Sequence, residues 1–455
     1  MLLFTTSMNK QIIFAVSAVV ILIAAGAGVV LFMNNNSDSG NTITVTDGVG
    51  REVTVPSDVK RVACVGYGVL RYYSYVGDME KLVGVESREK NSTAWSRPYT
   101  IANQDLFNSL TTDIGANGSA SSTADREKLV LADLDVLFIS SGLDKAGADE
   151  LQEAIKTPVV RISTAESMPF DEQLYKSLRL IAKVVGTEER AEEVISYVKS
   201  IQDDFQERTS SIPEAERKTA YVGAMSESGA HGIDFSTAYY TLFEALNVNN
   251  AYAKYLKDSG KTDEKRLIHD ISKEVIPLMD PDYIILDDGG LSIVMDDYAT
   301  SSSWYDTLKA FSNGNIAIQN NFNSYDGNLE IILANGYYLG KYFYPEQFKD
   351  VDFVDKYNEI TTKLLGKPLY NTITPHFPYA YDAWNTHSYS ITDDSPDHNV
   401  TILNVGNPGS VFKGKIVQFS VSGSPSSVKV NGETVTATQG IYSFKIMGDT
   451  TITVA

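Results

Sequence analysis

The residue types that most often perform catalysis or bind metals are sparse in this sequence and are not grouped. We find no phosphate-binding glycine loop ending in Lys and Ser or Thr, no His-Glu-x-x-His helix, no cysteine pair and no Gly-x-Ser-x-Gly turn. The five histidines show no metal-ligand spacing: His231, His269, His376, His387 and His398. We therefore expect a protein that is not an enzyme and that has no cofactor or metal site of its own.

Tyrosine supplies most of the remaining polar chemistry. The 455 residues include 26 tyrosines against 18 phenylalanines. A tyrosine ring has an apolar face and a polar tip, which suits an aromatic pocket that must also form hydrogen bonds. The single cysteine, Cys64, lies within an apolar run and is expected to be a small buried side chain. These features favour binding over catalysis.

The stretch "VTDGVGREVTVPSDVKRVACVGYG", residues 45–68, indicates how such residues are positioned. Two alternating segments flank the turn Asp47-Gly48-Val49-Gly50, which predicts a hairpin. Pro56 ends the second segment, and the apolar run Val62 to Val65 then predicts a buried strand that stops at Gly66-Tyr67-Gly68. Loops at the carboxyl ends of such strands are where open α/β sheets bind ligands.

Strand and helix patterns alternate through two successive regions, which predicts two lobes with mainly parallel sheets. The expected strands of the first lobe are 62–65, 83–85, 136–140 and 159–162. Those of the second are 219–224, 283–286 and 316–318, with helices at 242–246 and 329–343 among them. Between the lobes, residues 187–210 carry apolar residues on one helical face, with Thr187 as the expected N-cap. A helix of about 22 residues is about 33 Å long and can span a domain.

The N-terminal region predicts a membrane-associated, extracytoplasmic protein. Residues 12–33 are an uncharged segment that is long enough for a membrane-spanning helix. By the positive-inside rule, Lys10 before it places the N-terminus in the cytoplasm. Small residues at 24, 25 and 27 leave open a cleaved signal peptide instead. No cysteine follows this segment, so we expect no lipid-modified cysteine anchor. The formal net charge of -20 argues against nucleic acid as a partner.

The composition changes again near residue 399, where short alternating strands and Asn431-Gly432 predict a small all-β module. Spacing or surface adhesion is its expected role. The expected domains are an anchor or signal segment at 1–33, a polar linker at 34–44, an N-terminal α/β lobe at 45–168, lobe-spanning helices at 169–212, a C-terminal α/β lobe and tail at 213–395, and a small β-sandwich-like domain at 396–455.

Several segments, taken together and in order, resemble the family of ABC-transporter solute-binding proteins that bind cobalamin and ferric siderophores. They are "DGVGREVTVPSDVKRVACVG", "YVGDMEKLVGVES", "REKLVLADLDVLFIS", "KTPVVRI", "KEVIPLMDPDYIILDD" and "WYDTLKAFSNGNIAIQ". Together they cover about residues 42–365. The segments "GYGVLRYYSYVG", "SRPYTIAN", "AHGIDFS" and "NNFNSYDGN" are similar to an iron-complex transport branch.

The resemblance implies two α/β lobes joined by a long backbone helix, with a ligand held between them and only a small closure. It implies a membrane permease and a cytoplasmic ATPase as partners, and we expect the chain itself to be a monomer. In the family, one glutamate on each lobe contacts permease arginines. Glu127 and Glu274 match these places, although Leu134 replaces the usual proline in the first segment. The alternative is a glutamate that only favours the helix dipole.

We expect the ligand to contact residues in strand-end loops of both lobes. The candidates are Tyr67, Arg71, Arg97, Tyr99, Ser140, Ser141, Met225, His231, Trp304, Asn323 and Tyr325. Arginines that face a cleft would pair with carboxylates of an iron chelate, and surface ion pairing is their alternative role. Asp287 and Asp288 also end a strand, but they could equally cap the next helix.

The expected function is therefore an extracytoplasmic receptor that captures a ferric siderophore-like chelate and delivers it to a permease. A corrinoid such as cobalamin, or haem, is an alternative ligand of the same family. A metal-cluster or chelatase enzyme has a similar two-lobed architecture, but one strand cysteine argues against a cluster. A cell-surface structural or adhesive protein without a transport role is the alternative of another class.

Overall fold

The computed structural model describes most of the chain after residue 40. The described residues are 41–115, 125–140, 142–165, 168–261, 268–324, 326–384, 388–405, 408–409, 411–412 and 416–455. Residues 42–455 form one compact unit. The expected anchor at 12–33 lies outside the described residues. Within the described ranges, no helix has the length and apolar character needed to span a membrane.

The folded unit opens with the expected antiparallel hairpin of β1 (Thr42–Thr46) and β2 (Glu52–Pro56). Asp47 shapes its turn, because Asp47 Oδ1 accepts a 2.9 Å hydrogen bond from the backbone N–H of Arg51. The two side chains also form a buried ion pair at 3.0 Å. Arg51 Nη1 donates to the carbonyl of Val159 at 2.9 Å, which fixes the hairpin to the first sheet.

The described strands of the N-terminal lobe form a parallel four-stranded sheet in the order β4-β3-β5-β6. The strands are β3 (Val62–Val65), β4 (Leu82–Gly84), β5 (Val136–Ile139) and β6 (Val159–Arg161). Successive side chains of a strand point to opposite faces, so a wholly apolar strand needs cover on both. Cys64 packs in the core that contains residues of α2 and α7, and Ala63 packs in the core that contains residues of α5 and α6.

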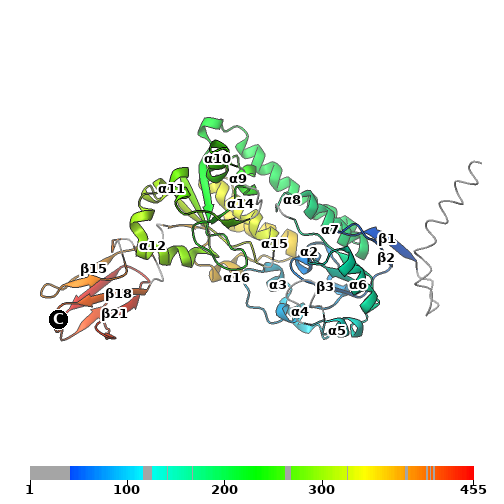
Figure 1. Ribbon diagram of the computed structural model, residues 1–455, viewed down its shortest axis with the longest axis horizontal. Coiled ribbons are helices and arrows are strands. Elements are labelled where there is room, and N and C mark those ends of the chain that lie inside the picture. Colours follow the sequence, from blue (N-terminus) through cyan, green and yellow to red (C-terminus); the bar gives the residue numbers. More distant parts are fainter. Residues whose placement is uncertain are drawn as a thin grey trace, which may run out of the picture. The chain divides into compact units, whose positions relative to one another are not determined.

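The helices of this lobe connect the strands and supply that cover (Figure 1). They are α2 (Val69–Val76), η1 (Met79–Lys81), η2 (Ser87–Glu89), α3 (Pro98–Ala102), α4 (Gln104–Ser109), α5 (Arg126–Leu131), α6 (Lys145–Ile155) and α7 (Glu172–Val185). Each of α5, α6 and α7 begins after an aspartate whose side chain accepts a backbone N–H of the first turn. Such caps satisfy N–H groups that have no partner inside the helix.

The described strands of the C-terminal lobe form a second sheet in the order β13-β12-β11-β7-β9. They are β7 (Thr219–Gly223), β9 (Asn249–Asn250), β11 (Tyr283–Asp287), β12 (Ile316–Gln319) and β13 (Asp382–Ala383). All pairs are parallel except β12 with β13. A short antiparallel pair joins β8 (Phe235–Ser236) to β10 (His269–Asp270).

Helices also surround this second sheet. They are η3 (Glu214–Glu216), α9 (Thr241–Ala245), α10 (Ala251–Asp258), α11 (Val275–Met279), α12 (Leu291–Tyr305), α13 (Lys309–Ser312) and α14 (Leu329–Phe343). Helix α12 is kinked at Ser301, whose backbone is not helical. Val222 and Ile285 of the sheet belong to the same hydrophobic core as Cys64 of the first sheet. One core therefore passes through both lobes.

The expected long helix is α8 (Glu188–Thr209), 22 residues with one buried face. Thr187 occupies its N-cap position but makes no capping hydrogen bond, because its hydroxyl donates to the carbonyl of Val76 at 2.6 Å instead. The sequence pattern predicts Thr187 as the residue at the start of the helix, but it does not predict the hydrogen bond from Thr187 to Val76 of α2. Figure 1 shows α8 running past the helices of both lobes.

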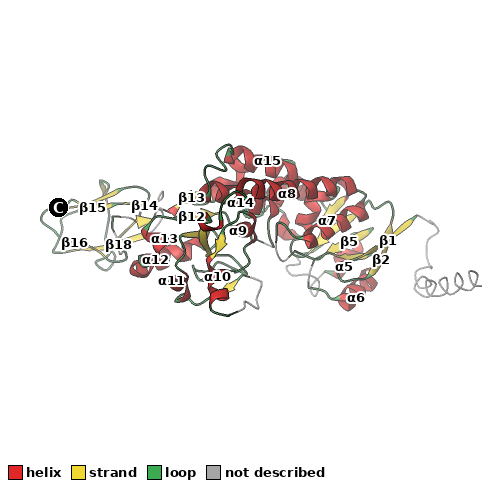
Figure 2. Cartoon of the chain, turned by 90° about the horizontal axis from the view of Figure 1, so that it is seen from above, coloured by secondary structure: helices red, strands yellow, loops and turns green. Residues whose placement is uncertain are grey.

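A second connection between the lobes comes from later in the chain. Helix α15 (Phe353–Leu365) contacts α2, α8 and α14, and Figure 2 shows it beside α8. Lys367 Nζ donates to the carbonyl of Ala102 in α3 at 2.6 Å. The ring of His376 stacks on Trp95 of the N-terminal lobe with centroids 3.6 Å apart. His376 lies in η4 (Thr374–His376), which follows α16 (Tyr370–Ile373).

The C-terminal residues form the expected all-β module around Phe419, Val428 and Ile452. Asn431 and Gly432 have positive φ and form the turn between β19 and β20, as expected for this dipeptide. The strands are β14 (Ser388–Tyr389), β15 (Ile391–Asp393), β16 (Val400–Ile402), β17 (Val411–Phe412), β18 (Ile416–Val421), β19 (Val428–Val430), β20 (Glu433–Thr434), β21 (Tyr442–Lys445) and β22 (Thr450–Val454).

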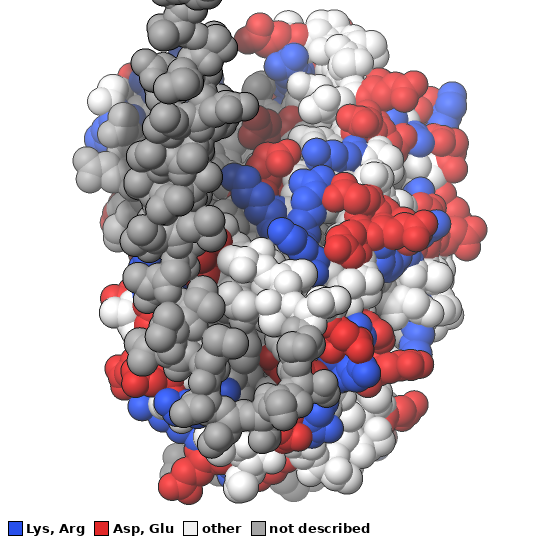
Figure 3. All heavy atoms as spheres, turned by 90° about the vertical axis from the view of Figure 1, so that its right-hand side faces the viewer, with Lys and Arg blue, Asp and Glu red and all other residues white. Residues whose placement is uncertain are grey.

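Charged side chains of both signs share the surface. On the face in Figure 3, Asp and Glu side chains lie beside the Lys and Arg side chains. The formal net charge of -20 argues against the broad basic field that nucleic-acid binding needs.

Candidate ligand-binding cleft

A cavity of about 310 Å³ lies where loops of the two lobes meet. Its lining residues are Thr164, Ala165, Met168, Met225, Glu227, Thr237, Tyr239, Tyr240, Thr241, Ile268, Phe322, Asn323, Asp326, Gly327 and Ile332. Such a volume is at the lower end for small-molecule sites. The lining combines apolar and aromatic side chains with three threonines, one asparagine and two carboxylates, so it can both enclose a ligand and orient it through polar contacts.

The strand order explains why these residues meet. Residues 164–168 follow β6 of the first sheet, residues 225–227 follow β7, and residues 322–327 follow β12 of the second sheet. Parallel strands end at one common edge of a sheet, so their following loops gather there. The cavity is thus built from the carboxyl ends of both sheets.

A close approach between Gly68 and Asp326 joins the loops of the two lobes. Gly68 precedes α2 with a φ of 76°, and a Cβ at this position would lie 2.6 Å from Asp326 Oδ2. Any larger side chain at position 68 would therefore collide with the carboxylate. This contact and the positive φ explain the glycine at position 68, in the segment where the sequence pattern shows only that the first strand stops.

Two of the predicted ligand residues, Met225 and Asn323, line the cavity. Asn323 Nδ2 donates to the carbonyl of Ser226 and to Glu227 Oε2, both at 2.7 Å. Asn323 therefore joins the loop after β12 to the loop after β7. Ligand contact by Met225 and Asn323 stays a prediction.

Arg71, one of the predicted ligand residues, is directed at protein groups between the lobes, and ligand contact by it stays a prediction. The side chain is fully buried. Its Nε donates to Asn328 Oδ1 at 3.0 Å and its Nη2 donates to the carbonyl of Ser324 at 2.5 Å. The guanidinium also lies over the Tyr99 ring, 5.0 Å from its centroid. Arg71 is a contact between the lobes, made across more than 250 residues of sequence.

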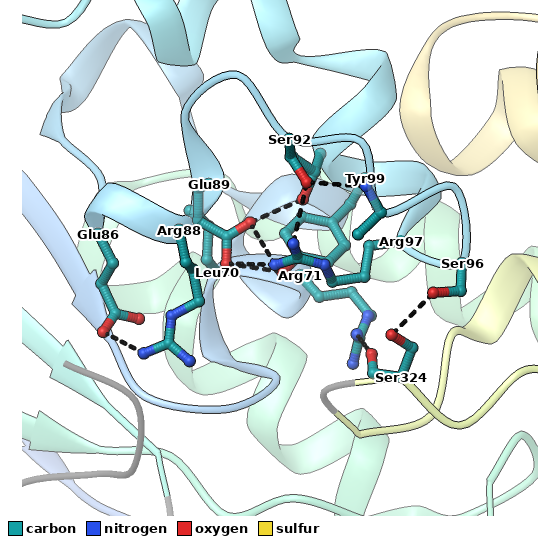
Figure 4. A network of polar contacts seen from close by, with 12 residues as sticks. Leu70, Arg71, Glu86, Arg88, Glu89, Ser92, Ser96, Arg97, Tyr99 and Ser324 are labelled. Atoms are coloured by element: carbon teal, nitrogen blue, oxygen red, sulfur yellow. Dashed lines mark hydrogen bonds and ion pairs between the residues drawn. The ribbon is translucent and has the colours of Figure 1, made fainter. Parts of the chain in front are cut away.

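Arg97 and Tyr99 are likewise buried around an internal carboxylate, Glu89, and neither lines the cavity. Ligand contact by Arg97 and Tyr99 stays a prediction. Arg97 Nη1 lies 3.1 Å from Glu89 Oε2, and the Tyr99 hydroxyl donates to Glu89 Oε1 at 3.1 Å. Thr100 Oγ1 donates to Glu89 Oε2 at 2.7 Å. Arg97 Nη2 donates to Ser92 Oγ at 2.9 Å. Figure 4 shows this network next to Arg71.

Tyr67 is exposed at the end of β3, with 39% of its surface accessible. The Arg88 guanidinium lies over its ring, 5.6 Å from the centroid, and Arg88 pairs with Glu86 at 2.8 Å. Tyr67 is absent from the lining of the cavity. Ser140, the residue that follows β5, is fully buried. Ser141 and Tyr325 lie outside the described residues.

His231 and Trp304 do not line the cavity either. His231 stacks on Phe235 with centroids 3.6 Å apart, and its Nε2 lies 2.7 Å from the carbonyl of Glu227. Trp304 lies on α12, where the ammonium of Lys273 is 4.3 Å from its ring centroid. Both aromatic side chains therefore have partners within the C-terminal lobe.

Sequence reasoning missed the aromatic and acidic part of the lining. The segment "STAYY" supplies Tyr239 and Tyr240, and "NNFNSYDGN" supplies Phe322 and Asp326. The pair of adjacent tyrosines after a short strand was the available signal. The sequence contains no signal that would single out Glu227 as a binding residue, since a single glutamate in a loop usually faces solvent.

A buried hydrogen-bond chain leads from the cavity wall to Asp287 at the end of β11. The Tyr240 hydroxyl donates to Gln319 Oε1 at 2.5 Å, and Gln319 Nε2 donates to Asp287 Oδ2 at 3.1 Å. Burial raises the pKa of Asp287 to about 7. Burial also raises the pKa of the neighbouring Asp288, to about 6. Asp287 thus supports the cavity wall through Gln319.

The described residues show no cluster suited to metal binding. Among them, no group of three or more His, Cys, Asp or Glu side chains comes close enough to hold an ion. Cys64 is buried in β3, and burial raises the pKa of its thiol well above the usual value. A thiol in this state is a poor nucleophile or ligand.

The two glutamates expected to contact a permease occupy equivalent positions in the two lobes. Glu127 is in the first turn of α5, which precedes β5, and Glu274 is the N-cap residue of α11, which precedes β11. Both side chains are exposed. Their contact with a permease stays a prediction.

Comparisons with known proteins agree with this architecture. A family model described as periplasmic binding protein matches residues 62–318. An uncharacterized ABC transporter substrate-binding lipoprotein of Bacillus subtilis (strain 168) is 19% identical over 247 residues, which cover 54% of this chain and 69% of that protein.

Solved structures show the same fold at low sequence identity. A molybdate periplasmic binding protein of Haemophilus influenzae, with molybdate bound, is 16% identical with a TM-score of 0.54, covering 72% of this chain and 98% of that one. A periplasmic solute binding protein from Veillonella parvula is 19% identical with a TM-score of 0.53, covering 74% and 97%. Because the family model spans more than half of the sequence, the chain belongs to the periplasmic binding protein family, whose members are substrate-binding receptors and not enzymes.

Proposed function

We propose that this chain is the extracytoplasmic receptor of an ABC importer, and that it captures an iron complex between its lobes and delivers it to a permease. The observation that carries the proposal is the cavity at the carboxyl ends of both sheets. Its lining belongs to loops of both lobes, so a bound ligand would contact both at once. The iron-complex assignment rests on the sequence resemblance in residues 42–365.

Exposed leucines beside the two predicted docking glutamates support delivery to a permease as the second half of this function. On each lobe an exposed leucine follows the predicted docking glutamate by four residues, which is one helical turn. Leu131 follows Glu127 and has 82% of its surface exposed, and Leu278 follows Glu274 with 70% exposed. Large apolar side chains with this exposure are typical of interaction surfaces. Each lobe thus presents a glutamate followed, one helical turn later, by an exposed leucine.

Ligand titration of residues 34–455 tests the capture step. We expect saturable quenching of tryptophan fluorescence by a ferric siderophore, with cobalamin and haem as competing ligands at matched concentrations. Tyr239→Ala should weaken binding by about tenfold, because Tyr239 is the exposed ring of the cavity.

Ile293→Ala is the matched control for this titration. Ile293 has 40% of its surface exposed, against 44% for Tyr239, and it does not line the cavity. Equal affinity of the two variants would contradict the cavity as the ligand site. Binding of cobalamin or haem alone would keep the receptor but change its ligand, and binding of none of them would remove the iron and corrinoid assignments.

A further inference from the structure

The charges around the cavity differ from what an anionic ligand requires. Among the described lining residues, Glu227 and Asp326 are acidic and none is Lys, Arg or His. The two carboxylates lie close enough for the charge of Glu227 to raise the pKa of Asp326, although burial of Asp326 is the larger cause. An anion placed here would meet two like charges.

Three arginines of the N-terminal lobe, Arg71, Arg88 and Arg97, have internal partners. Arg71 donates to Asn328 and Ser324, Arg97 pairs with Glu89, and Arg88 pairs with Glu86. Figure 4 shows Arg88 directed at Glu86, Arg97 at Glu89 and Arg71 at Ser324. Turning one of them toward an anionic ligand would leave a buried carboxylate or carbonyl without its donor, which is costly.

Asp326 itself lacks a complete set of partners. Its Oδ1 accepts a 2.8 Å hydrogen bond from the backbone N–H of Gly327. Its Oδ2 is buried near Gly68 and accepts no hydrogen bond from the described residues. The positive charge of Arg71 lowers the pKa of Asp326, although burial of Asp326 raises it more. The cavity wall therefore carries negative charge that a bound cation would compensate.

Aromatic rings complete an environment that suits a cation. Tyr239, Tyr240 and Phe322 line the same cavity as the two carboxylates. The faces of such rings attract ammonium and other cations, most strongly where water is excluded. A lining of carboxylates and rings favours a ligand with positive charge and N–H or O–H donors.

We infer that the cleft selects a positively charged ligand, within the proposed function a cationic ferric complex, and disfavours strongly anionic chelates. The iron-complex part of this inference rests on the proposed function. The positive charge of the ligand rests on the cavity lining alone. This inference replaces the expectation that cleft arginines pair with carboxylates of the ligand. The specificity-determining residues are Glu227 and Asp326.

The test compares ligands of one size class and different charge, by isothermal titration with residues 34–455. The probes are ferrioxamine B, a cationic ferric trihydroxamate, ferrichrome, a neutral one, ferric enterobactin, a strongly anionic tricatecholate, and iron-free deferoxamine, an organic cation. We expect ferrioxamine B to bind most tightly. Glu227→Gln and Asp326→Asn should each weaken its binding by about tenfold and leave ferrichrome nearly unchanged.

Asp296→Asn is the control, because Asp296 is an exposed carboxylate of the same lobe that does not line the cavity. Glu227 is exposed, so Glu227→Gln should fold even if the Asp326 variant does not. Tighter binding of ferric enterobactin would overturn the charge inference and leave the receptor function intact. Binding of deferoxamine without any iron complex would overturn the iron assignment and support the charge inference. Binding of neither cation would overturn the charge inference.

Discussion

At the scale of single residues, what decides the role of a charged side chain is its partner. Arg71 and Arg97 have the residue type that binds anionic chelates, yet both are buried against internal acceptors. Removing one member of the buried Arg97–Glu89 ion pair leaves an uncompensated charge, which costs about 3–5 kcal/mol. In this structure these arginines therefore hold protein segments together, and their contact with a ligand stays a prediction.

Asp287 leads to a prediction on how the stability of the fold depends on pH. Burial raises its pKa from 3.8 to about 7 in the folded state. Between these two values the unfolded chain has released this proton and the folded chain has kept it, so this group makes the free energy of unfolding fall as pH rises. Above the folded pKa the contribution is constant.

Asp287→Asn should remove this dependence, because an amide does not titrate. Relative to the native chain, the variant should gain stability as pH rises from about 4 to about 7, by up to a few kcal/mol. Urea unfolding at several pH values measures this difference, with exposed Asp306→Asn as the control. Parallel stability profiles for native chain and variant would show that Asp287 is not a proton-retaining group.

At the scale of elements, the sequence predicts strands and helices well because their signal is local. The runs 62–65 and 136–139 are wholly apolar, and both are strands buried on two faces. The apolar positions of residues 187–210 follow one helical face, and α8 buries that face. Local pattern also explains the Asn431-Gly432 turn.

The candidate site could be predicted only in part, because its contacts are not local. Met225 and Asn323 lie at strand ends, and the strand-end rule places them in the cavity wall. The same rule also selects Arg71, whose partner Asn328 is 257 residues away in the sequence. No pattern within one segment shows which carboxylate or carbonyl a distant arginine will meet.

Helices α5 and α11 lead to a prediction on the permease contact. Leu131→Ser and Leu278→Ser should each reduce stimulation of the transporter's ATPase by ligand-loaded receptor, because each removes an exposed apolar group beside a predicted docking glutamate. Glu127→Gln and Glu274→Gln should reduce it as well, mainly by slowing association. Reconstitution of the permease and ATPase in vesicles measures the effect.

We expect these variants to bind the ligand as tightly as the native chain does, since both leucines and both glutamates lie outside the cavity lining. Val354→Ser provides the control, because Val354 is an exposed apolar residue on α15, which is a different element. If the leucine variants stimulate the ATPase as well as the native chain does, these leucines make no permease contact.

At the scale of the folded unit from residue 42 onward, the lobes are connected far more extensively than by one helix. A single hydrophobic core contains residues of both sheets. Ser96 and Ser324 of opposite lobes bond at 3.0 Å, and the Tyr75 hydroxyl donates to Glu330 at 2.5 Å. Opening the cleft widely would expose this core and break these bonds. The cleft is therefore expected to adjust to its ligand by loop and side-chain movement.

Distance measurements between spin labels test this rigidity. Labels at Glu153→Cys on α6 and Lys257→Cys on α10 report on the two lobes, and both positions are exposed. Buried Cys64, whose thiol pKa is raised by burial, should not take up label. We expect one narrow distance distribution that shifts by no more than about 2 Å when ligand binds.

Arg71→Met should broaden that distribution, because it removes donors to Asn328 and Ser324 at the meeting point of the lobes. Arg126→Met, which removes an exposed ion pair with Glu150, should leave it narrow, since surface pairs contribute little. Two well-separated distances in the native chain without ligand would contradict a rigid core and would indicate lobes that open as separate bodies. In that case ligand affinity would depend on the equilibrium between open and closed forms as well as on the charges of the cavity.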